Sequence, residues 1–277
     1  MTSDTLSADR ILAGLKTGVV ARNLHYLAET GSTMEEARRL AEQGAPDGTV
    51  VIADYQTAGR GRLKRRWQAL PGSSLLLSLI FRPTIASHQV QQLTMLCGLA
   101  VAESVEAETG LPVGLKWPND LEISGAKIGG ILTEVELSGV HVSYAVVGVG
   151  LNVNLDPQEL SGPLPVRASS LSAELGRPVA RLPLLWAVLQ AVEARYLALG
   201  TGAQALHAEW AARLATIGRM VTVSTGDRAW DGLAEGVDAD GALLVRRADG
   251  SLERIIAGDV SVRSSAKGQS KTSKVIS

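Results

Sequence analysis

Residues 59–67 read GRGRLKRRW, and this basic stretch constrains the fold and the chemistry more than any other part of the chain. It places five cations, from Arg60 to Arg66, and two glycines in a short segment that ends in Trp67. No Asp or Glu occurs from Tyr55 to Ala102, although the whole chain is nearly balanced, with 27 basic and 28 acidic residues. A local positive field in a neutral protein indicates an anionic partner.

Composition sets the class of protein. The 277 residues, 45% of them hydrophobic, suffice for one large core and a small second domain. The single cysteine, Cys97, lies in an apolar helical pattern, which excludes a disulfide framework and fits a reducing cytoplasm. No apolar run reaches the roughly 18 residues of a membrane span, and the N-terminus has no signal pattern. We therefore expect a soluble, cytoplasmic protein without membrane contact.

Hydrophobic periodicity on either side of the basic stretch predicts an α+β fold with a mainly antiparallel central sheet. A helix should begin at Ser32 or Thr33, whose hydroxyls can cap it, and stop at Gly44. A second, long helix should run from Ser87 to Gly110. A short helix is expected near residues 8–15, and strands are expected over 50–53, 75–81, 113–117, 121–123, 128–137 and 142–153, the last four as an antiparallel meander.

In the C-terminal third the sequence pattern changes at Gly218, from helical periodicity to short alternating strands. Before it, a Pro-rich loop over 157–178 precedes helical patterns over 182–199 and 203–215. After it, short alternating strands carry turn signals at Gly226-Asp227, Asp240-Gly241 and Asp249-Gly250, the pattern of a small β-barrel. We expect a short segment over 1–23, a main domain over 24–217, a barrel over 218–264 and a disordered tail over 265–277.

Four segments carry candidate chemistry, and the first is the basic stretch itself. Its glycines let backbone N–H groups approach an anion, and its arginines can grip phosphate or carboxylate oxygens in pairs. An exposed basic loop or a nucleic-acid patch is the alternative.

The second segment, residues 116–120, places Asn119 and Asp120 on a turn where Asp120 could hold Mg²⁺. A plain Pro-Asn-Asp turn explains it as well.

The third segment, residues 125–130, brings Lys127 into a strand beside Gly129 and Gly130, so that a ligand could lie against bare backbone. A β-bulge with a surface lysine is the alternative. The fourth, residues 148–154, reads GVGLNVN and lacks the third glycine and the helix start of the dinucleotide fingerprint. The Walker pattern is also absent, so neither familiar phosphate loop applies.

Taken in order, these segments resemble the biotin protein ligases. GSTMEEA, DYQTAGRGRLKRRW, LKWPNDL, AKIGGILTE and VGVGLNVN follow one another as in that family, and the resemblance covers residues 27–262. It implies the biotin/lipoate ligase catalytic fold over 24–217 and an SH3-like barrel over 218–264. The segment before Leu27 is too short for the N-terminal DNA-binding domain of some relatives, so we expect no DNA binding.

The resemblance also implies roles for individual residues. Hydroxyls and a carboxamide suit the neutral cyclic urea of biotin, which offers both donors and an acceptor. Arg62, Lys127 and Asp120 are implied as catalytic, with Asp120 also the metal ligand. The implied biotin-binding residues are Ser32, Thr33, Gln56, Arg60, Gly61, Arg62 and Lys127, and the implied ATP-binding residues are Trp67, Asn119, Gly129, Gly130 and Asn152.

Two positions depart from the family pattern. Met34 stands where Asn usually follows Ser-Thr, which removes a polar side chain from the biotin end. Lys64 stands where the loop more often has glycine, which adds a charge and stiffens the loop.

The implied reaction has two steps and needs Mg²⁺. Biotin and ATP give biotinyl-5′-AMP and pyrophosphate, and a lysine of a biotin carboxyl carrier domain then takes the biotin, with Asp120 as a candidate base. Exposed strands of the central sheet make a homodimer plausible. Two alternatives remain: a lipoate–protein ligase, which shares the fold, and a nucleic-acid-binding protein that uses the basic loop.

Overall fold

The computed structural model describes residues 4–160, 167–225, 228–256 and 259–262, which fall into two compact units. The first unit runs to Ala215 and the second starts at Thr216. The tail predicted over 265–277 lies outside the described residues.

A seven-stranded sheet forms the centre of the first unit, in the order β1-β2-β3-β7-β6-β5-β4. Only β1 and β2 run parallel, and the other neighbours are antiparallel. The predicted mixed, mainly antiparallel sheet is thus confirmed, with β4 to β7 as the meander. The strands are β1 (Leu24–Thr30), β2 (Thr49–Gln56), β3 (Ser74–Phe81), β4 (Gly114–Lys116), β5 (Asp120–Ile123), β6 (Ala126–Ser138) and β7 (His141–Asn152).

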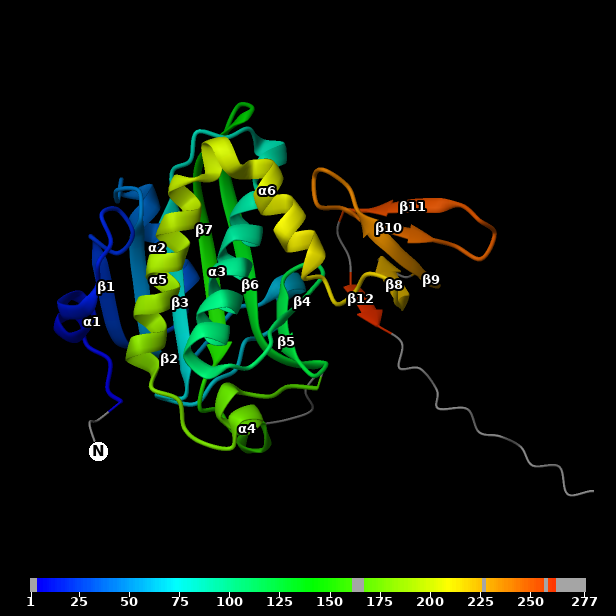
Figure 1. Ribbon diagram of the computed structural model, residues 1–277. Coiled ribbons are helices and arrows are strands. Elements are labelled where there is room, and N and C mark those ends of the chain that lie inside the picture. Colours follow the sequence, from blue (N-terminus) through cyan, green and yellow to red (C-terminus); the bar gives the residue numbers. More distant parts are fainter. Residues whose placement is uncertain (1–3, 161–166, 226–227, 257–258, 263–277) are drawn as a thin grey trace, which may run out of the picture. The chain divides into compact units, whose positions relative to one another are not determined.

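Helices cover both faces of this sheet, and three of them, α3, α5 and α6, lie over one face (Figure 1). On that side Thr94 of α3 hydrogen-bonds Thr133 of β6. Helix α2 packs on the opposite face, where Met34 lies against Gly148. The helices are α1 (Ala8–Gly14), α2 (Thr33–Glu42), α3 (Gln91–Thr109), α4 (Leu171–Leu175), α5 (Arg181–Leu197) and α6 (Leu199–Ala212).

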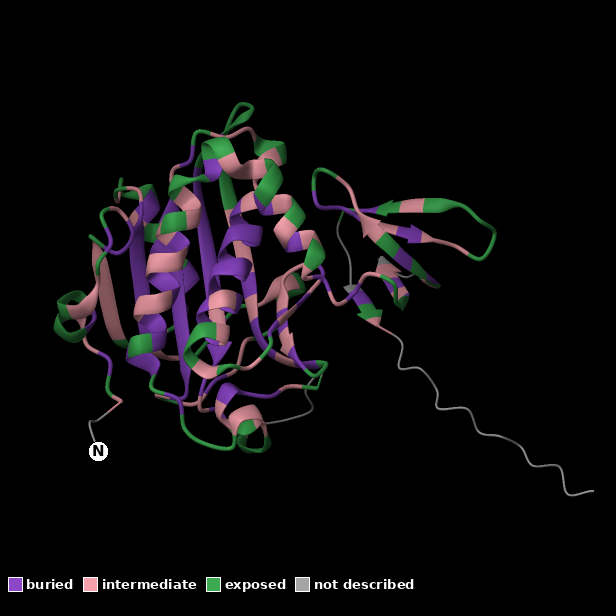
Figure 2. Ribbon diagram, viewed as in Figure 1, coloured by how far each residue is buried: buried purple, intermediate pink, exposed green. Residues whose placement is uncertain are grey.

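The core lies where α3 meets the central strands. Every residue of β3 is buried, and so is the run from Leu93 to Ala102 in α3. Figure 2 shows this buried layer running through β3, β7 and the inner side of α3. Cys97 belongs to it, as its apolar helical setting indicated, and burial raises the pKa of its thiol.

Some boundaries differ from those predicted. The long helix is split, because a 3₁₀ turn over Ser87–Gln89 precedes α3, which then ends at Gly110 with φ 74°. Helix α4 lies inside the predicted Pro-rich loop, and strand β1 was not predicted at all. In the described part of the chain no single helix is long and apolar enough to cross a membrane. Helices α5 and α6 would pass that test only as a pair, and they are bent by 115°.

The second unit is a five-stranded antiparallel sheet, in the order β11-β10-β9-β8-β12. Its buried side includes Val221, Val223 and Leu243. Two predicted turns contain glycines at positive φ, Gly241 at 82° and Gly250 at 87°, and the third, at residues 226–227, lies outside the described residues. The all-β module is thus confirmed. Its strands are β8 (Met220–Thr225), β9 (Arg228–Val237), β10 (Leu243–Arg246), β11 (Leu252–Ile255) and β12 (Asp259–Val262).

Candidate active site

A polar cluster surrounds the first turn of α2. Gln56, at the end of β2, accepts hydrogen bonds at Oε1 from the backbone N of Thr33 at 2.7 Å and from Thr33 Oγ1 at 3.0 Å. Ser78 Oγ of β3 donates to Thr33 Oγ1 at 2.8 Å. Ser32 occupies the N-cap position but makes no side-chain cap bond. The prediction that a Ser32 or Thr33 hydroxyl caps the helix is therefore wrong: the Ser32 hydroxyl makes no cap bond, and the Thr33 hydroxyl bonds to Gln56, which also accepts from the N–H of Thr33, the first residue of α2.

Three candidate residues carry buried polar atoms that have no hydrogen-bond partner among the described residues. These atoms are Ser32 Oγ, Trp67 Nε1 and Asn152 Oδ1. Leaving a buried polar group unpaired costs about 1–3 kcal/mol. Each of these atoms can take a hydrogen bond from or to a water molecule or a polar group of a ligand.

The basic loop, residues 57–67, leaves β2 after Gln56 and folds back on itself. Gly61 N donates to Arg65 O at 2.8 Å and Trp67 N donates to Gly59 O at 2.9 Å. At its tip Leu63 and Lys64 both have left-handed backbone, with φ of 53° and 60°. This conformation costs a non-glycine residue roughly 1–2 kcal/mol. Lys64 therefore occupies a position whose backbone favours glycine.

Side chains of the loop bind the sheet and the turn before β5. Arg60 Nη2 lies 2.6 Å from Glu134 Oε1 of β6, and Arg62 Nη1 donates to Asn119 Oδ1 at 3.3 Å. An open cleft of about 580 Å³ is lined by residues 57–66 of the loop together with Glu35, Leu132 and Glu134. Arg60, Gly61 and Arg62 thus line one cleft.

Lys127 stands beside this loop, at the start of β6. Its Nζ lies 2.5 Å from Asp120 Oδ1 and 5.6 Å from the centroid of the Trp67 ring. A Cβ on Gly130 would lie 3.4 Å from both Lys127 Nζ and Asp120 Oδ1, and one on Gly150 would lie 2.7 Å from the Trp67 ring. The absence of a Cβ at Gly150 therefore makes room for the Trp67 ring, whereas a Cβ at Gly130 would be in ordinary van der Waals contact with Lys127 and Asp120. The β-bulge alternative is also present, as a register shift at Leu121/Glu122.

Asn152, at the end of β7, is tied to Lys127 through residues 167–169. Its Nδ2 donates to Ser169 O at 3.0 Å, and Ser169 N donates to Lys127 O at 2.8 Å. Because the Ser169 carbonyl fixes the carboxamide orientation, Asn152 Oδ1 is presented as an acceptor.

The structure brings some of the predicted site residues into contact and leaves others apart. Contacts join Thr33 with Gln56, Arg62 with Asn119, and Lys127 with Asp120, Trp67 and Gly130. Gly129 stands apart, since a Cβ there would lie 2.9 Å from Gly150 O, so close strand packing explains this glycine. No cluster of three or more His, Cys, Asp or Glu that could hold a metal occurs within the described ranges.

Sequence reasoning missed Ser78, Glu134 and Ser169. A serine inside the apolar run of 75–81 was a usable signal for Ser78, because a buried hydroxyl needs a partner. Glu134 and Ser169 had no comparable signal.

Comparison with known proteins identifies the family. A sequence model of the biotin/lipoate A/B protein ligase family matches residues 27–152, and one of the biotin protein ligase C-terminal domain matches residues 216–263. The chain is 36% identical over 256 residues to the bifunctional ligase/repressor BirA of Bacillus subtilis, covering 92% of this chain and 78% of that protein. It is also 36% identical over 245 residues to the biotin–[acetyl-CoA-carboxylase] ligase of Mycobacterium tuberculosis, covering 86% and 88% of the two chains.

A solved structure supports the same assignment. The biotin protein ligase from Aquifex aeolicus in complex with biotin and ATP superposes with a TM-score of 0.73 at 30% identity, over 88% of this chain and 100% of that one. Fold, motif order and both domain matches agree, and we conclude that this chain is an enzyme of the biotin protein ligase family.

Proposed function

We propose that this chain attaches biotin to a lysine of a biotin carboxyl carrier domain, at the expense of ATP. The observation that carries the proposal is the meeting of two kinds of group. A neutral polar cluster, Ser32, Thr33 and Gln56, lies at one end of the basic loop, and a cationic cluster with Arg62 and Lys127 lies beside the same loop. A ligand with a neutral polar head and an anionic tail matches both.

The polar cluster fits the ureido head of biotin. Ser32 Oγ is buried and has no partner in the described structure, and a hydroxyl can both donate and accept. The bonds among Thr33, Gln56 and Ser78 hold the neighbouring groups in place. Met34 adds no polar group, because it is buried in an apolar cluster with Ala37 and Val146. We therefore assign the ureido contacts to Ser32, Thr33 and Gln56.

The cationic cluster addresses the electrostatic problem of the first step. A biotin carboxylate oxygen attacks the α-phosphorus of ATP, and the bond to the bridging oxygen breaks as pyrophosphate leaves. Two anions must approach each other for this to happen. Lys127 and Arg62 would stabilise that approach and the charge on the transferring phosphorus, by position and charge rather than by covalent chemistry.

Asp120 fits a magnesium ion that arrives with ATP. Mg²⁺ is usually held by one or two carboxylates together with substrate phosphates and water. A carboxylate has two oxygens, so Asp120 can bind Lys127 through Oδ1 and a metal through Oδ2. When bound, the ion would neutralise phosphate charge.

In the second step the ε-amine of the carrier lysine attacks the carbonyl carbon of the biotinyl adenylate, and AMP leaves. The amine must first lose a proton. Asp120 is the candidate acceptor, and its ion pair with Lys127 supports a position near the phosphate end.

The base end of the nucleotide would meet Trp67 and Asn152. An acceptor at Asn152 Oδ1 suits the exocyclic amine of adenine and opposes the O6 carbonyl of guanine. This chemistry favours ATP over GTP.

We also propose a setting for the reaction. A single buried cysteine fits the cytoplasm. The edge strand β1 offers unpaired backbone that could support a homodimer, which light scattering during size exclusion would detect.

The proposal is tested by pyrophosphate release with ATP and either biotin or lipoate, followed by mass spectrometry of a carrier domain. We expect release only with biotin, and one added biotinyl group on the carrier lysine. A carrier with that lysine changed to arginine is the matched control and should stay unmodified. Release with lipoate alone would favour the lipoate ligase alternative, and binding of RNA without any release would favour the nucleic-acid alternative.

A further inference from the structure

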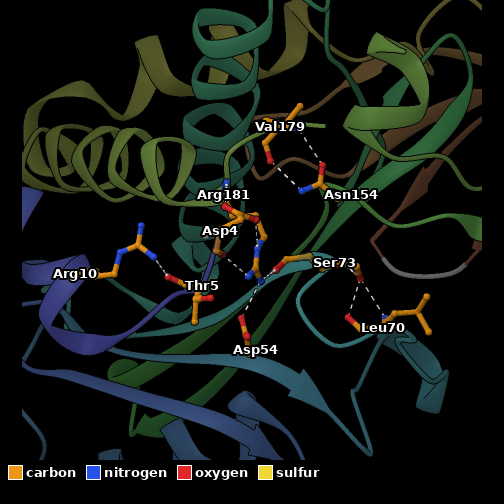
Figure 3. A network of polar contacts seen from close by, with 10 residues as sticks. Asp4, Thr5, Arg10, Asp54, Leu70, Ser73, Asn154, Val179 and Arg181 are labelled. Carbon is orange, nitrogen blue, oxygen red and sulfur yellow. Dashed lines mark hydrogen bonds and ion pairs between the residues drawn. The ribbon is translucent and has the colours of Figure 1, made fainter. Parts of the chain in front are cut away.

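Arg181, the first residue of α5, lies outside the motifs that identify the family and has an unusually complete set of partners. Its side chain is only 3% exposed. Nε donates to Asp4 Oδ2, Nη1 to Asp54 Oδ1 and Nη2 to Asp4 O, each at 2.8 Å, and Nη1 also reaches Ser74 O at 3.2 Å. Figure 3 shows the guanidinium held between Asp4 and Asp54.

Helix stability does not explain this placement. A cation at the first position of a helix faces the positive end of the helix dipole, which is unfavourable. Burying a guanidinium also costs several kcal/mol unless carboxylates compensate it. Asp4 offsets both effects, since its Oδ1 accepts from Arg181 N at 2.8 Å while its Oδ2 pairs with the side chain. The position of Arg181 is better explained by the two strands that its side chain connects.

Arg181 holds the two ends of the chain segment that contains the basic loop. Asp54 lies two residues before Gln56 on β2, and Ser74 opens β3 where the chain returns to the sheet. The ends also touch directly, because Gly72 N donates to Asp54 O at 3.2 Å. One buried cation therefore clamps both stems of residues 55–73.

A second set of hydrogen bonds joins the residues just before α5 to the end of β7, where the proposed adenine contact Asn152 lies. Val179, two residues before Arg181, exchanges two hydrogen bonds of 2.9 Å with the Asn154 carboxamide. Asn154 N in turn donates to Ser73 O at 2.7 Å, and Ser74 is paired with Asn152. Val179, Asn154 and Ser73 are labelled in Figure 3.

We propose that Arg181, held by Asp4, is a positioning residue that fixes both stems of the basic loop, so that the closed loop retains the biotinyl adenylate. The adenylate part of this inference rests on the proposed function, whereas the clamp itself does not. The N-terminal segment thereby takes part in the site without touching substrate.

The matched control is Arg195, which lies on the same helix. Its guanidinium is 17% exposed and binds Glu103 of α3 and Glu209 of α6, also two carboxylates, but it contacts neither stem. Arg181→Lys and Arg195→Lys each keep the charge and lose the planar fork. A general loss of stability would affect both variants.

The first readout is hydrogen exchange of the ligand-free, full-length chain and needs no activity. Arg181→Lys should speed exchange over residues 55–73 by about tenfold or more, the effect of losing ~1.4 kcal/mol of local protection. Arg195→Lys should leave that segment unchanged. Equal protection of residues 55–73 in the parent and in Arg181→Lys would overturn the clamp, whatever the protein catalyses.

The second readout is the escape rate of preformed biotinyl adenylate, measured by trapping in an excess of unlabelled biotin and ATP. Arg181→Lys should raise the escape rate and the KM for biotin by about tenfold while kcat for carrier transfer changes less than twofold. Arg195→Lys should match the parent. Equal escape from both variants at equal Tm would overturn the retention role. A second variant covers the case in which Arg181→Lys does not fold. Asp54→Asn removes only one partner of Arg181 and should raise both the exchange rate of residues 55–73 and the escape rate of the adenylate. A parent protein that makes no adenylate would defeat the proposed function and leave the exchange result standing.

Discussion

Lys127 is the residue whose surroundings most directly support a role in catalysis. It is paired with Asp120 at 2.5 Å and lies near the Trp67 ring and the bare backbone of Gly130. Lys127→Ala should lower the rate of biotin-dependent pyrophosphate release by two to three orders of magnitude, since a charge partner of the transferring phosphate contributes about 2–4 kcal/mol. Lys16→Ala, which removes an exposed lysine, is the control. Parent-like release by Lys127→Ala would remove this lysine from the mechanism.

At this scale the sequence predicted residue types better than their bonds. The order of motifs indicated Thr33, Gln56 and Lys127, and all three lie in the groups described. The sequence did not predict that Gln56 accepts from the first N–H of α2, because that bond joins residues 23 positions apart and depends on the pairing of β1 with β2. The pairing of Arg60 with Glu134 of β6 was not predicted either, because these partners lie 74 positions apart.

Among the elements, the basic loop combines candidate site residues with backbone strain. Lys64 has φ 60°, and a glycine there would remove a steric cost of about 1 kcal/mol. We expect Lys64→Gly to lower the escape rate of the adenylate about fivefold relative to Lys64→Ala, which removes the same charge but keeps a Cβ. Trapping experiments on both variants give the comparison. Identical escape rates would show that strain at this residue does not affect loop closure.

Helix α5 offers a test of stability against pH. Glu193 accepts hydrogen bonds from the backbone N of Gly18, Val19 and Val20 at 2.6–3.0 Å. Burial opposes ionisation, but the hydrogen bonds outweigh it and lower the pKa of Glu193 below the ordinary 4.5. The folded protein therefore binds fewer protons here than the unfolded chain does, so the contribution is present above pH 4.5 and is lost as the pH falls through the lowered pKa.

Glu193→Gln should therefore lower the free energy of unfolding at neutral pH by roughly 1–2 kcal/mol, the scale of hydrogen bonds to a charged acceptor. Urea denaturation should show this difference shrinking at acidic pH. Glu108→Gln, at an exposed site on α3, is the control. A difference that stays constant down to pH 3 would contradict the assigned cause.

Element prediction failed where tertiary contacts decide the structure. Strand β1 has the sequence LHYLAET, which alternates poorly, and it forms through parallel pairing with β2. Helix α3 could be predicted because its apolar run is long and Gly110 ends it in left-handed backbone. The role of Arg181 could not be inferred from sequence, since Asp4 and Asp54 lie 177 and 127 positions away.

At the scale of the whole molecule, every candidate site residue from Ser32 to Asn152 belongs to the first unit. The second unit has its own buried side chains, including Val223 and Val245. Its polar clusters fit a structural role, since Asp238 accepts from Ala242 N and pairs with Arg254. We propose that this unit supports docking of ATP or of the carrier rather than chemistry.

A chain that ends at Ala215 should therefore keep its affinity for biotin while turnover falls, because the polar cluster of Ser32, Thr33 and Gln56 remains whole. The cut after Ala215 preserves the hydrogen bond that its N–H donates to Leu115 O at 2.8 Å. Calorimetric titration with biotin gives the affinity, pyrophosphate release gives the turnover, and circular dichroism establishes that the shortened chain is folded. Adding back the separate second unit controls for an effect of truncation alone. A folded truncation that no longer binds biotin would show that the second unit contributes to biotin binding. Unchanged turnover would show that the second unit has no role in docking ATP or the carrier.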